Sequence, residues 1–378
     1  MTFKRRAFGS QQEISLFTLG TMRAIESAEQ MYLVLKEASL TGINHIETSP
    51  VYGPAEILLG ESIKRLHSKG IFPQDKWIIT SKILPGKTFL EGKQLLKKIL
   101  RDTRMPKIDN LAIHGLNIYE HLIWATEGEG AKLLHWALKE KIVNQVGFSS
   151  HGPQALIKDA INSNKFHFCS LHVHLLNQVN LPLAKLALKK GMGVLAISPA
   201  DKGGHLHSPS KQLVEDCWPI APLELAYRFL LTQGITSLTL GAAKTKDFMI
   251  AKKLINSINP LTKTEKNCLE NLFKQSDMRL GQTLCGQCRK CLPCPQEIPI
   301  PELLRLRNLY IGHDLQSFAK ERYNLIGRAG HWWEEVNASA CNKCGDCLER
   351  CPHNLDIPEL LKETHLQLLD KPKRRLWS

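Results

Sequence analysis

Short apolar runs alternate with longer amphipathic segments over roughly the first 260 residues. The runs are rich in β-branched residues, and their starts lie about 30 residues apart on average, which is the size of one strand–helix unit. The segments between them place apolar residues at helical spacing, as in AEQMYLVLKEASL and EGKQLLKKILRDT. The eight runs are SLFTLG (from Ser15), HIETS (His45), WIITSKI (Trp77), NLAIHG (Asn110), NQVGFSS (Asn144), HFCSLHV (His167), GVLAIS (Gly193) and SLTLG (Ser237).

Eight strands that alternate with helices predict a parallel sheet closed into a (β/α)8 barrel, the TIM barrel. A doubly wound sheet is the alternative, but no GxGxxG turn follows the first strand. After a helical stretch around residues 262–276, the composition becomes cysteine-rich. We therefore predict an α/β barrel domain over residues 1–270, followed by a small, mainly helical, ferredoxin-like iron–sulfur domain over residues 271–378.

Polar residues occur where the predicted strands end, and the active site of a (β/α)8 barrel lies at that carboxyl-terminal face. The candidate residues are Glu47, Tyr52, Lys82, His114, Ser149 and Ser150, together with the loop GAAKTKD after the eighth strand. We expect these side chains to meet at one end of the barrel.

The composition is that of a globular protein, with 43% hydrophobic and 23% charged residues in 378. No run approaches the ~18 apolar residues that a membrane span requires, so we expect a cytoplasmic protein. The formal net charge is +14, but lysine and arginine are spread over predicted helix surfaces, which argues against a nucleic-acid partner. The positive charge could still attract an acidic electron carrier such as a ferredoxin, or a phosphorylated cofactor.

Eight of the 11 cysteines form two runs, each of which ends in Cys-Pro. The second run matches CxxCxxCxxxCP, in which three thiolates bind one [4Fe-4S] cluster and the fourth binds the other. Zinc would need only four thiolates in pairs, and disulfides are rare in a cytosol. The candidate ligands are Cys285, Cys288, Cys291 and Cys294 in the first run, and Cys341, Cys344, Cys347 and Cys351 in the second.

The first run is one residue shorter than the second, between its third and fourth cysteines. IPELLR (from Ile300) and IPELLK (from Ile357) follow the two runs at the same distance from the fourth cysteine, so a unit of cysteines and helix is repeated. The shorter spacing is tolerable if the fourth cysteine binds the partner cluster. We expect at least one [4Fe-4S] cluster and favour two.

The strand-end residues resemble those of a known family. The stretch GTMRAIESAEQMYLVLKEASLTGINHIETSPVYGPAEILLGESI is similar to the opening of aldo/keto reductases, with an acid and a tyrosine five residues apart and the motif Gly-x-Ala-Glu-x-x-x-Gly. The similarity continues with WIITSKI, NLAIHG, VGFSSHG and LTLGAAKTKDF, and covers roughly residues 12–258. With the cysteine domain, it resembles the iron–sulfur-bearing branch of that family.

This resemblance implies catalytic roles for four residues in carbonyl reduction by hydride transfer. Tyr52 would donate the proton, and the ammonium of Lys82 would lower the phenol pKa from its usual value near ~10. His114 would orient the carbonyl or share the proton. An acid at position 47 would hold Lys82, but the family has aspartate where this chain has Glu47.

The extra methylene of Glu47 leads us to expect slow or altered turnover, because displacing reacting groups by ~1 Å can cost ~100-fold in rate. The alternative interpretation is that Glu47 and Lys82 are only a buried ion pair that fills the barrel mouth.

The resemblance also implies a nicotinamide cofactor, bound without a Rossmann turn. Ser149 and Ser150 resemble the pair that meets the carboxamide. Lys244 would meet a 2′-phosphate at the start of the last barrel helix, where backbone N–H groups also favour anions. We therefore expect NADP(H) rather than NAD(H).

The leading hypothesis is an oxidoreductase that reduces a small-molecule carbonyl substrate at the barrel mouth, with a nicotinamide cofactor and/or electrons delivered through [4Fe-4S] clusters. Hydride transfer moves two electrons together whereas a cluster moves one, so the clusters could instead be structural. The alternative hypothesis is a catalytically altered barrel that acts as an iron–sulfur electron-transfer or redox-sensing protein.

Overall fold

The computed structural model of the chain describes residues 3–10, 12–328 and 334–371. These residues form two compact units. The first comprises the described residues up to Pro199 together with Ala226–Pro260, and the second comprises Ala200–Leu225 and the described residues from Leu261 onward. These units are defined by which residues pack together, not by position along the chain. The domain boundary at residue 270 therefore stays a prediction.

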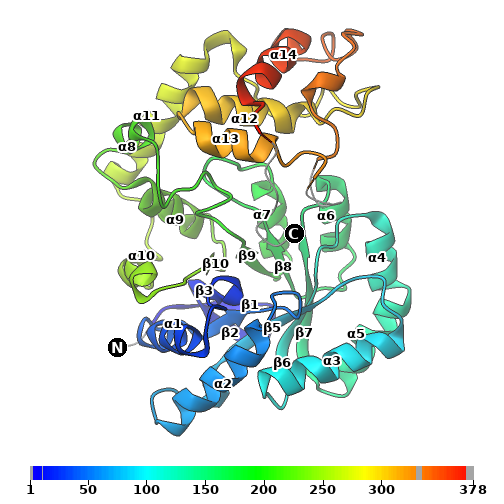
Figure 1. Cartoon of the computed structure of the whole chain (residues 1–378), viewed down its shortest axis with the longest axis vertical. Helices are drawn as coiled ribbons and strands as arrows, with labels where there is room; N and C mark the ends of the chain where they lie inside the picture. The colour runs from blue at the N-terminus through cyan, green and yellow to red at the C-terminus, as the bar shows by residue number, and fades with distance from the viewer. Residues whose placement is uncertain (1–2, 11, 329–333, 372–378) are drawn as a thin grey trace. The chain divides into compact units, whose positions relative to one another are not determined.

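Eight parallel strands of the first unit form a closed barrel, in the order β10-β3-β4-β5-β6-β7-β8-β9 (Figure 1). The predicted (β/α)8 barrel is therefore confirmed, and each of the eight apolar runs overlaps one barrel strand. The strands are β3 (Phe17–Gly20), β4 (His45–Glu47), β5 (Ile78–Ile83), β6 (Ile108–Ile113), β7 (Val143–Ser150), β8 (Phe168–Leu171), β9 (Gly193–Ala196) and β10 (Ser237–Leu240).

Helices follow the strands, and the first of them lie on the outside of the barrel (Figure 1). Polar caps define where several begin: Ser27 accepts a hydrogen bond from the backbone N–H of Gln30, and Thr88 forms a capping box with Glu91. The helices are α1 (Ala28–Leu40), α2 (Ala55–Ser68), α3 (Phe89–Thr103), α4 (Tyr119–Thr126), α5 (Glu129–Lys139), α6 (Gln154–Asn162), α7 (Leu181–Lys189), α9 (Pro222–Thr232) and α10 (Met249–Leu254), with 3-10 turns η1 (Thr21–Arg23), η2 (Gln74–Lys76) and η3 (Thr245–Phe248).

An antiparallel hairpin precedes the barrel, formed by β1 (Arg5–Phe8) and β2 (Gln12–Ser15). Its Phe8 ring packs against Phe168, with the ring centroids 4.9 Å apart, and the Phe8 carbonyl accepts a hydrogen bond from Gln145 Nε2 at 2.9 Å. Position 193 must be glycine, because a Cβ there would lie 2.2 Å from the Phe8 ring. The hairpin therefore closes the amino-terminal end of the barrel, opposite the face that bears the candidate site.

Polar side chains cross the barrel interior below that site. His45 Nδ1 lies 2.8 Å from Thr18 Oγ1, and His45 Nε2 lies 2.7 Å from Thr80 Oγ1. Burial, reinforced by the nearby charge of Lys82, lowers the pKa of His45 to about 3. The imidazole is therefore neutral at physiological pH and links three adjacent strands by hydrogen bonds.

The second unit is mainly helical and contains both cysteine runs. Its helices are α8 (Lys211–Cys217), α11 (Lys263–Leu280), α12 (Ile300–Gly312), α13 (Gln316–Tyr323) and α14 (Ile357–Leu368), with 3-10 turns η4 (Gly281–Thr283) and η5 (Ala338–Ala340). Asp216 on α8 accepts two hydrogen bonds from the Arg279 guanidinium on α11, at 2.5 and 2.7 Å. This bidentate pair attaches residues between two barrel strands to the second unit.

The repeated sequence IPELL supplies the core of the second unit. Equivalent residues of α12 and α14 are buried in one apolar cluster, to which several cysteines also belong. These residues are Ile300, Leu303 and Leu304 of α12, and Ile357, Leu360 and Leu361 of α14. Among the residues that the structure describes, no helix is long and apolar enough to cross a membrane.

Candidate functional site

Lys82 lies at the centre of the candidate site in the barrel. It points into the barrel from β5 and is 2% exposed. Its Nζ lies 3.0 Å from the Tyr52 hydroxyl, 3.1 Å from the Thr48 carbonyl oxygen and 3.3 Å from Glu47 Oε1. These three contacts hold the ammonium beside the phenol oxygen.

The charge of Lys82 is maintained by its neighbours. Burial alone would lower the pKa of this lysine, but the carboxylate of Glu47 and the Tyr52 oxygen outweigh that effect, so its pKa lies above the usual value. Glu47 is 4% exposed and forms the ion pair from the end of β4. Within the described chain, Oε1 of Glu47 has no partner in hydrogen-bonding geometry.

Tyr52 occupies a tight turn between β4 and α2. Its N–H donates to the Ser49 carbonyl at 3.0 Å, and its own carbonyl accepts from the Ala55 N–H at 3.3 Å. Gly53 follows with a φ of +59°, a conformation that favours glycine. The turn therefore presents the phenol at the end of the strand, partly exposed.

His114 lies just beyond β6, where its N–H donates to the Ile83 carbonyl at 2.8 Å. Its ring meets the Tyr52 ring edge to face, with the centroids 5.8 Å apart and the planes at 90°. Burial, reinforced by the charge of Lys82, lowers the pKa of His114 to about 3. The imidazole is therefore neutral and acts as a hydrogen-bonding group rather than as a cation.

Ser49 is a site residue that sequence reasoning missed. Its hydroxyl lies 3.1 Å from His114 Nδ1, so the serine fixes the ring from the turn that also carries Tyr52. The predicted residues Tyr52, Lys82, His114 and Glu47 do come together. Ser49 is the last residue of the run HIETS, but nothing in that run distinguishes it from Thr48 as a partner of the histidine.

The hydroxyls of Ser149 and Ser150 bond to the loop after β6. Ser149 Oγ accepts from the Gly115 N–H at 3.1 Å, and Ser150 Oγ donates to the Leu116 carbonyl at 2.6 Å. Both serines therefore position the loop that follows His114. Their contact with a nicotinamide carboxamide stays a prediction.

The loop after β10 carries Lys244, whose side chain is exposed. The backbone N–H groups of Ala243 and Lys244 donate to the Asp247 carboxylate at 2.9 and 3.0 Å. The chain's own carboxylate thus occupies the N–H groups that the sequence analysis offered to a phosphate. These two N–H groups are therefore not free to bind a phosphate, whereas the side chain of Lys244 is exposed.

The eight cysteines of the two runs fall into two groups that cross between the runs. Burial raises the pKa of Cys285, and the nearby thiols of Cys288 and Cys351 raise it further. Burial also raises the pKa of Cys347, and its neighbouring thiols are Cys341, Cys294 and Cys344. The fourth cysteine of each run therefore lies near cysteines of the other run, and Cys291 also lies near Cys347.

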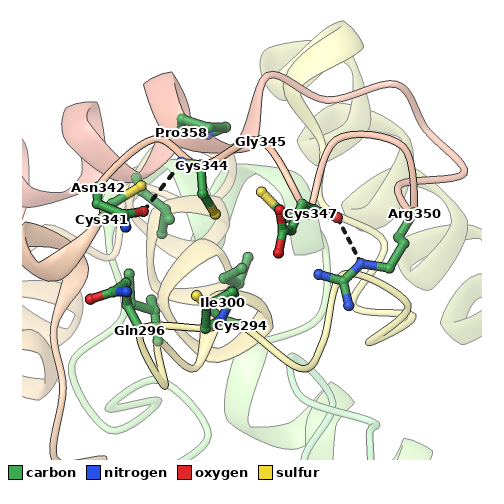
Figure 2. A pocket seen from close by; sticks show the side chains of 14 residues that line it. Cys294, Gln296, Ile300, Cys341, Asn342, Cys344, Gly345, Cys347, Arg350 and Pro358 are labelled. Atoms are coloured by element: carbon green, nitrogen blue, oxygen red, sulfur yellow. Dashed lines mark hydrogen bonds between the residues drawn. The ribbon is translucent and has the colours of Figure 1, made fainter.

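Two further observations agree with this crossing. Figure 2 shows one pocket that is lined by Cys294 of the first run and by Cys341, Cys344 and Cys347 of the second. In the other group, a Cβ on Gly286 would lie 2.8 Å from Nε2 of His353, so the residue just after Cys351-Pro352 lies against the first cysteine loop.

The two thiol groups fit iron–sulfur chemistry. Within the described ranges, no three His, Cys, Asp or Glu side chains are grouped as ligands of a single ion. In a [4Fe-4S] cluster each thiolate binds a different iron, so the four sulfurs stand farther apart than around one ion. Four thiols per group, partly enclosed by the apolar core, supply the donors that such a cluster needs.

The barrel, the lysine-bound tyrosine at its mouth and the crossed cysteine groups define an oxidoreductase with an iron–sulfur domain. Comparison with protein families matches residues 17–246 to the Aldo/keto reductase family and residues 284–356 to the 4Fe-4S dicluster domain. The protein belongs to the aldo/keto reductase family and carries a C-terminal 4Fe-4S domain, which confirms the resemblance seen in the sequence.

Individual relatives are distant. A stretch of 50 residues is 42% identical to D-arabinose 1-dehydrogenase of Saccharomyces cerevisiae, covering 13% of this chain and 14% of that protein. An aldo-keto reductase from Bacillus halodurans in its holo form superposes with a TM-score of 0.61 at 18% identity, over 71% of this chain and 96% of the other. A Bombyx mori aldo-keto reductase in complex with NADP gives a TM-score of 0.58 at 17% identity, over 72% and 93%. These structures establish the fold of the barrel.

Proposed function

We propose that this protein reduces the carbonyl group of a small molecule at the barrel mouth, with Tyr52 as the proton donor. The observation that carries the proposal is the Tyr52 hydroxyl 3.0 Å from the buried Lys82 ammonium, beside a neutral His114. A bound nicotinamide cofactor would supply the hydride. The product is an alcohol, formed from the carbonyl by one hydride and one proton.

Each residue of the site has a distinct part in the proton transfer. Tyr52 gives its proton to the carbonyl oxygen, and the Lys82 ammonium stabilises the negative charge that is left on the phenol oxygen. With the Ser49 hydroxyl as donor to Nδ1, His114 carries its proton on Nε2 and donates a hydrogen bond to the same carbonyl. Glu47, whose Oε1 lies 3.3 Å from the Lys82 Nζ, keeps Lys82 protonated.

For the cofactor we propose NADP(H), with the 2′-phosphate beside the side chain of Lys244. The exposed lysines of this loop supply the positive charge that a phosphate needs. The Asp247 carboxylate opposes phosphate binding, because this carboxylate already accepts hydrogen bonds from the Ala243 and Lys244 N–H groups. NADPH and NADH are therefore expected to differ less in affinity than an open phosphate site would allow.

Changing Asp247 to asparagine is expected to lower the Kd for NADPH about fivefold and to leave the Kd for NADH unchanged. Asparagine keeps an oxygen for the two N–H groups but removes the charge, which is worth about 1 kcal/mol at 4 Å in water. Both dissociation constants are measured by the quenching of tryptophan fluorescence on cofactor binding. Lys244→Ala is the control with the opposite expected effect: it should raise the Kd for NADPH and leave the Kd for NADH unchanged. An equal change for both cofactors would place the phosphate elsewhere.

For the second unit we propose two [4Fe-4S] clusters, which would supply one-electron transfer. Cys285, Cys288, Cys291 and Cys351 would hold one, and Cys294, Cys341, Cys344 and Cys347 the other. An acidic electron carrier such as a ferredoxin is the proposed partner. Lysine and arginine outnumber aspartate and glutamate in the first unit, whereas the two are almost equal in the second, so the attraction would come from the barrel.

An anaerobic titration with NADPH tests whether barrel and clusters exchange electrons. The reconstituted protein is titrated while its visible thiolate-to-iron absorption is followed, first alone and then with a panel of small aldehydes and ketones. Bleaching by NADPH would show exchange. NADPH consumption that depends on a carbonyl compound, without bleaching, would show a reductase that works independently of the clusters. No consumption with any carbonyl would contradict the proposed reductase activity.

A further inference from the structure

A short segment, residues 52–56, makes hydrogen bonds to both faces of β5 near the end of that strand. We propose that Glu56 is a positioning residue which, through its hydrogen bond to Ser81, holds the phenol of Tyr52 against Lys82. The proposal rests on the proposed function, because it concerns the geometry of the same proton donor. It adds a residue that lies outside the barrel mouth and touches neither the substrate nor the cofactor.

The two contacts use neighbouring residues of one strand. Successive side chains of a strand point to opposite faces, so Lys82 points into the barrel while Ser81 points outward to the helices. On the inner face, Lys82 Nζ donates to Tyr52 at 3.0 Å. On the outer face, Ser81 Oγ donates to Glu56 Oε1 at 2.6 Å. The segment is thus attached to the strand on both sides.

The backbone between the two contacts is short and constrained. Tyr52 and Glu56 are four residues apart, and the Ala55 N–H bonds back to the Tyr52 carbonyl at 3.3 Å. Glu56 lies in the first turn of α2, so a shift of its side chain would move the beginning of the helix. Because the turn is this compact, such a shift would carry Tyr52 with it.

The surroundings of Glu56 indicate that the carboxyl group has a purpose beyond capping the helix. An acidic side chain already favours a helix start when it is exposed to water, so capping does not require burial. Glu56 is instead 3% exposed, and among the described residues its Oε2 has no hydrogen-bond partner. Burying a carboxyl group with one oxygen unsatisfied is costly, so its contact with Ser81 is the feature that explains its position.

The helix cannot relax away from this contact. Gly60, one turn farther along α2, packs so closely on α3 that a Cβ there would lie 2.6 Å from the backbone of Thr103. The charged groups that face Glu56 are Lys98 and Asp102 of α3 and Lys82 of β5. Burial raises the pKa of Glu56 to about 7, although the hydrogen bond from Ser81 opposes this shift.

The raised pKa gives the contact a pH dependence. Below pH 7 the carboxyl is neutral and accepts a weaker hydrogen bond from Ser81, whereas above pH 7 it is ionised and the bond is charge-assisted. The phenol is therefore held most firmly on the alkaline side. We expect kcat of the wild type to rise through pH 7, and the same profile of Glu56→Gln to lack that step, because glutamine does not titrate.

The main test compares Ser81→Ala with Ser81→Thr, which restores the hydroxyl. Ser81→Ala should lower kcat by roughly 10- to 100-fold, as expected for reacting groups displaced by up to ~1 Å, and leave the Kd for NADPH unchanged. Ser81→Thr should restore kcat. Wild-type kcat in Ser81→Ala would overturn the proposal, and so would equal losses in both variants accompanied by equal falls in Tm.

A second measurement needs no substrate and separates this proposal from the proposed function. The protein is labelled with ¹³C at the tyrosine ring, and the Tyr52 resonance is assigned by its absence in Tyr52→Phe. Ser81→Ala should shift that resonance and Ser81→Thr should not. An unchanged resonance in Ser81→Ala would overturn the positioning role. If Ser81→Ala shifts the resonance as expected but the wild type reduces no carbonyl, the proposed function alone is contradicted.

Discussion

Changing Tyr52 to phenylalanine is expected to lower kcat for carbonyl reduction by about 10²- to 10⁴-fold, the range that a positioned proton donor contributes. The substitution removes only the hydroxyl that lies 3.0 Å from Lys82 and leaves a ring that can keep its edge-to-face contact with His114. The measurement is kcat and KM for a small aldehyde with the reconstituted protein. The Kd for NADPH should not change, because the phenol acts on the substrate oxygen.

Tyr119→Phe is the matched control for this prediction. It removes the same atom from the beginning of α4, where the Tyr119 hydroxyl donates to Asp159 at 2.9 Å on the surface. This variant should keep the wild-type kcat. If Tyr52→Phe also keeps it, another group donates the proton and the proposed role is wrong. A rise in the Kd for NADPH as large as the fall in kcat would instead assign Tyr52 to cofactor binding.

The barrel could be predicted from the sequence because its parallel strands are buried on both faces. Each such strand appears as a short apolar run, and eight runs separated by amphipathic segments are compatible with few folds other than this barrel. The hairpin β1–β2 could not be predicted in this way, since its strands are four residues each and largely polar. Only the structure shows that Phe8 and Ile14 of this hairpin pack into the core of the barrel. The packing of Ala200–Leu225 with the rest of the second unit could not be predicted either, because it uses contacts between residues distant in sequence, such as Asp216 and Arg279.

Site residues could be predicted where their position on a strand determines their direction. Glu47, Lys82 and His114 lie at strand ends, so the barrel alone brings them to one face. Ser49 was missed, and Asp247 was included only as part of the loop GAAKTKD, because their contributions depend on hydrogen-bond geometry within turns, which periodicity does not reveal. Glu56 was visible as part of the motif Gly-x-Ala-Glu, but only its burial and its contact with Ser81 suggest a role.

Each fourth cysteine is expected to protect the cysteines of the opposite run. Cys351→Ala should lower the iron content of the reconstituted protein from about eight to about four atoms per chain. The lost cluster should be the one held by the first run, because Cys351 lies beside Cys285. The measurement is alkylation of the folded protein, followed by mass mapping of the modified thiols. Cys285, Cys288 and Cys291 should become reactive. Cys294 should stay protected together with the three remaining cysteines of the second run, which are Cys341, Cys344 and Cys347.

Cys294→Ala is the reciprocal variant and should reverse the pattern, because Cys294 lies in the pocket with Cys341, Cys344 and Cys347. The two variants together exclude a general loss of structure, since each leaves a different set of thiols protected. If each run held its own cluster, Cys351→Ala would expose its own run and leave the first protected. The one-residue deletion in the first run favours the crossed arrangement, because a cysteine that reaches the partner cluster need not keep the spacing of its own loop.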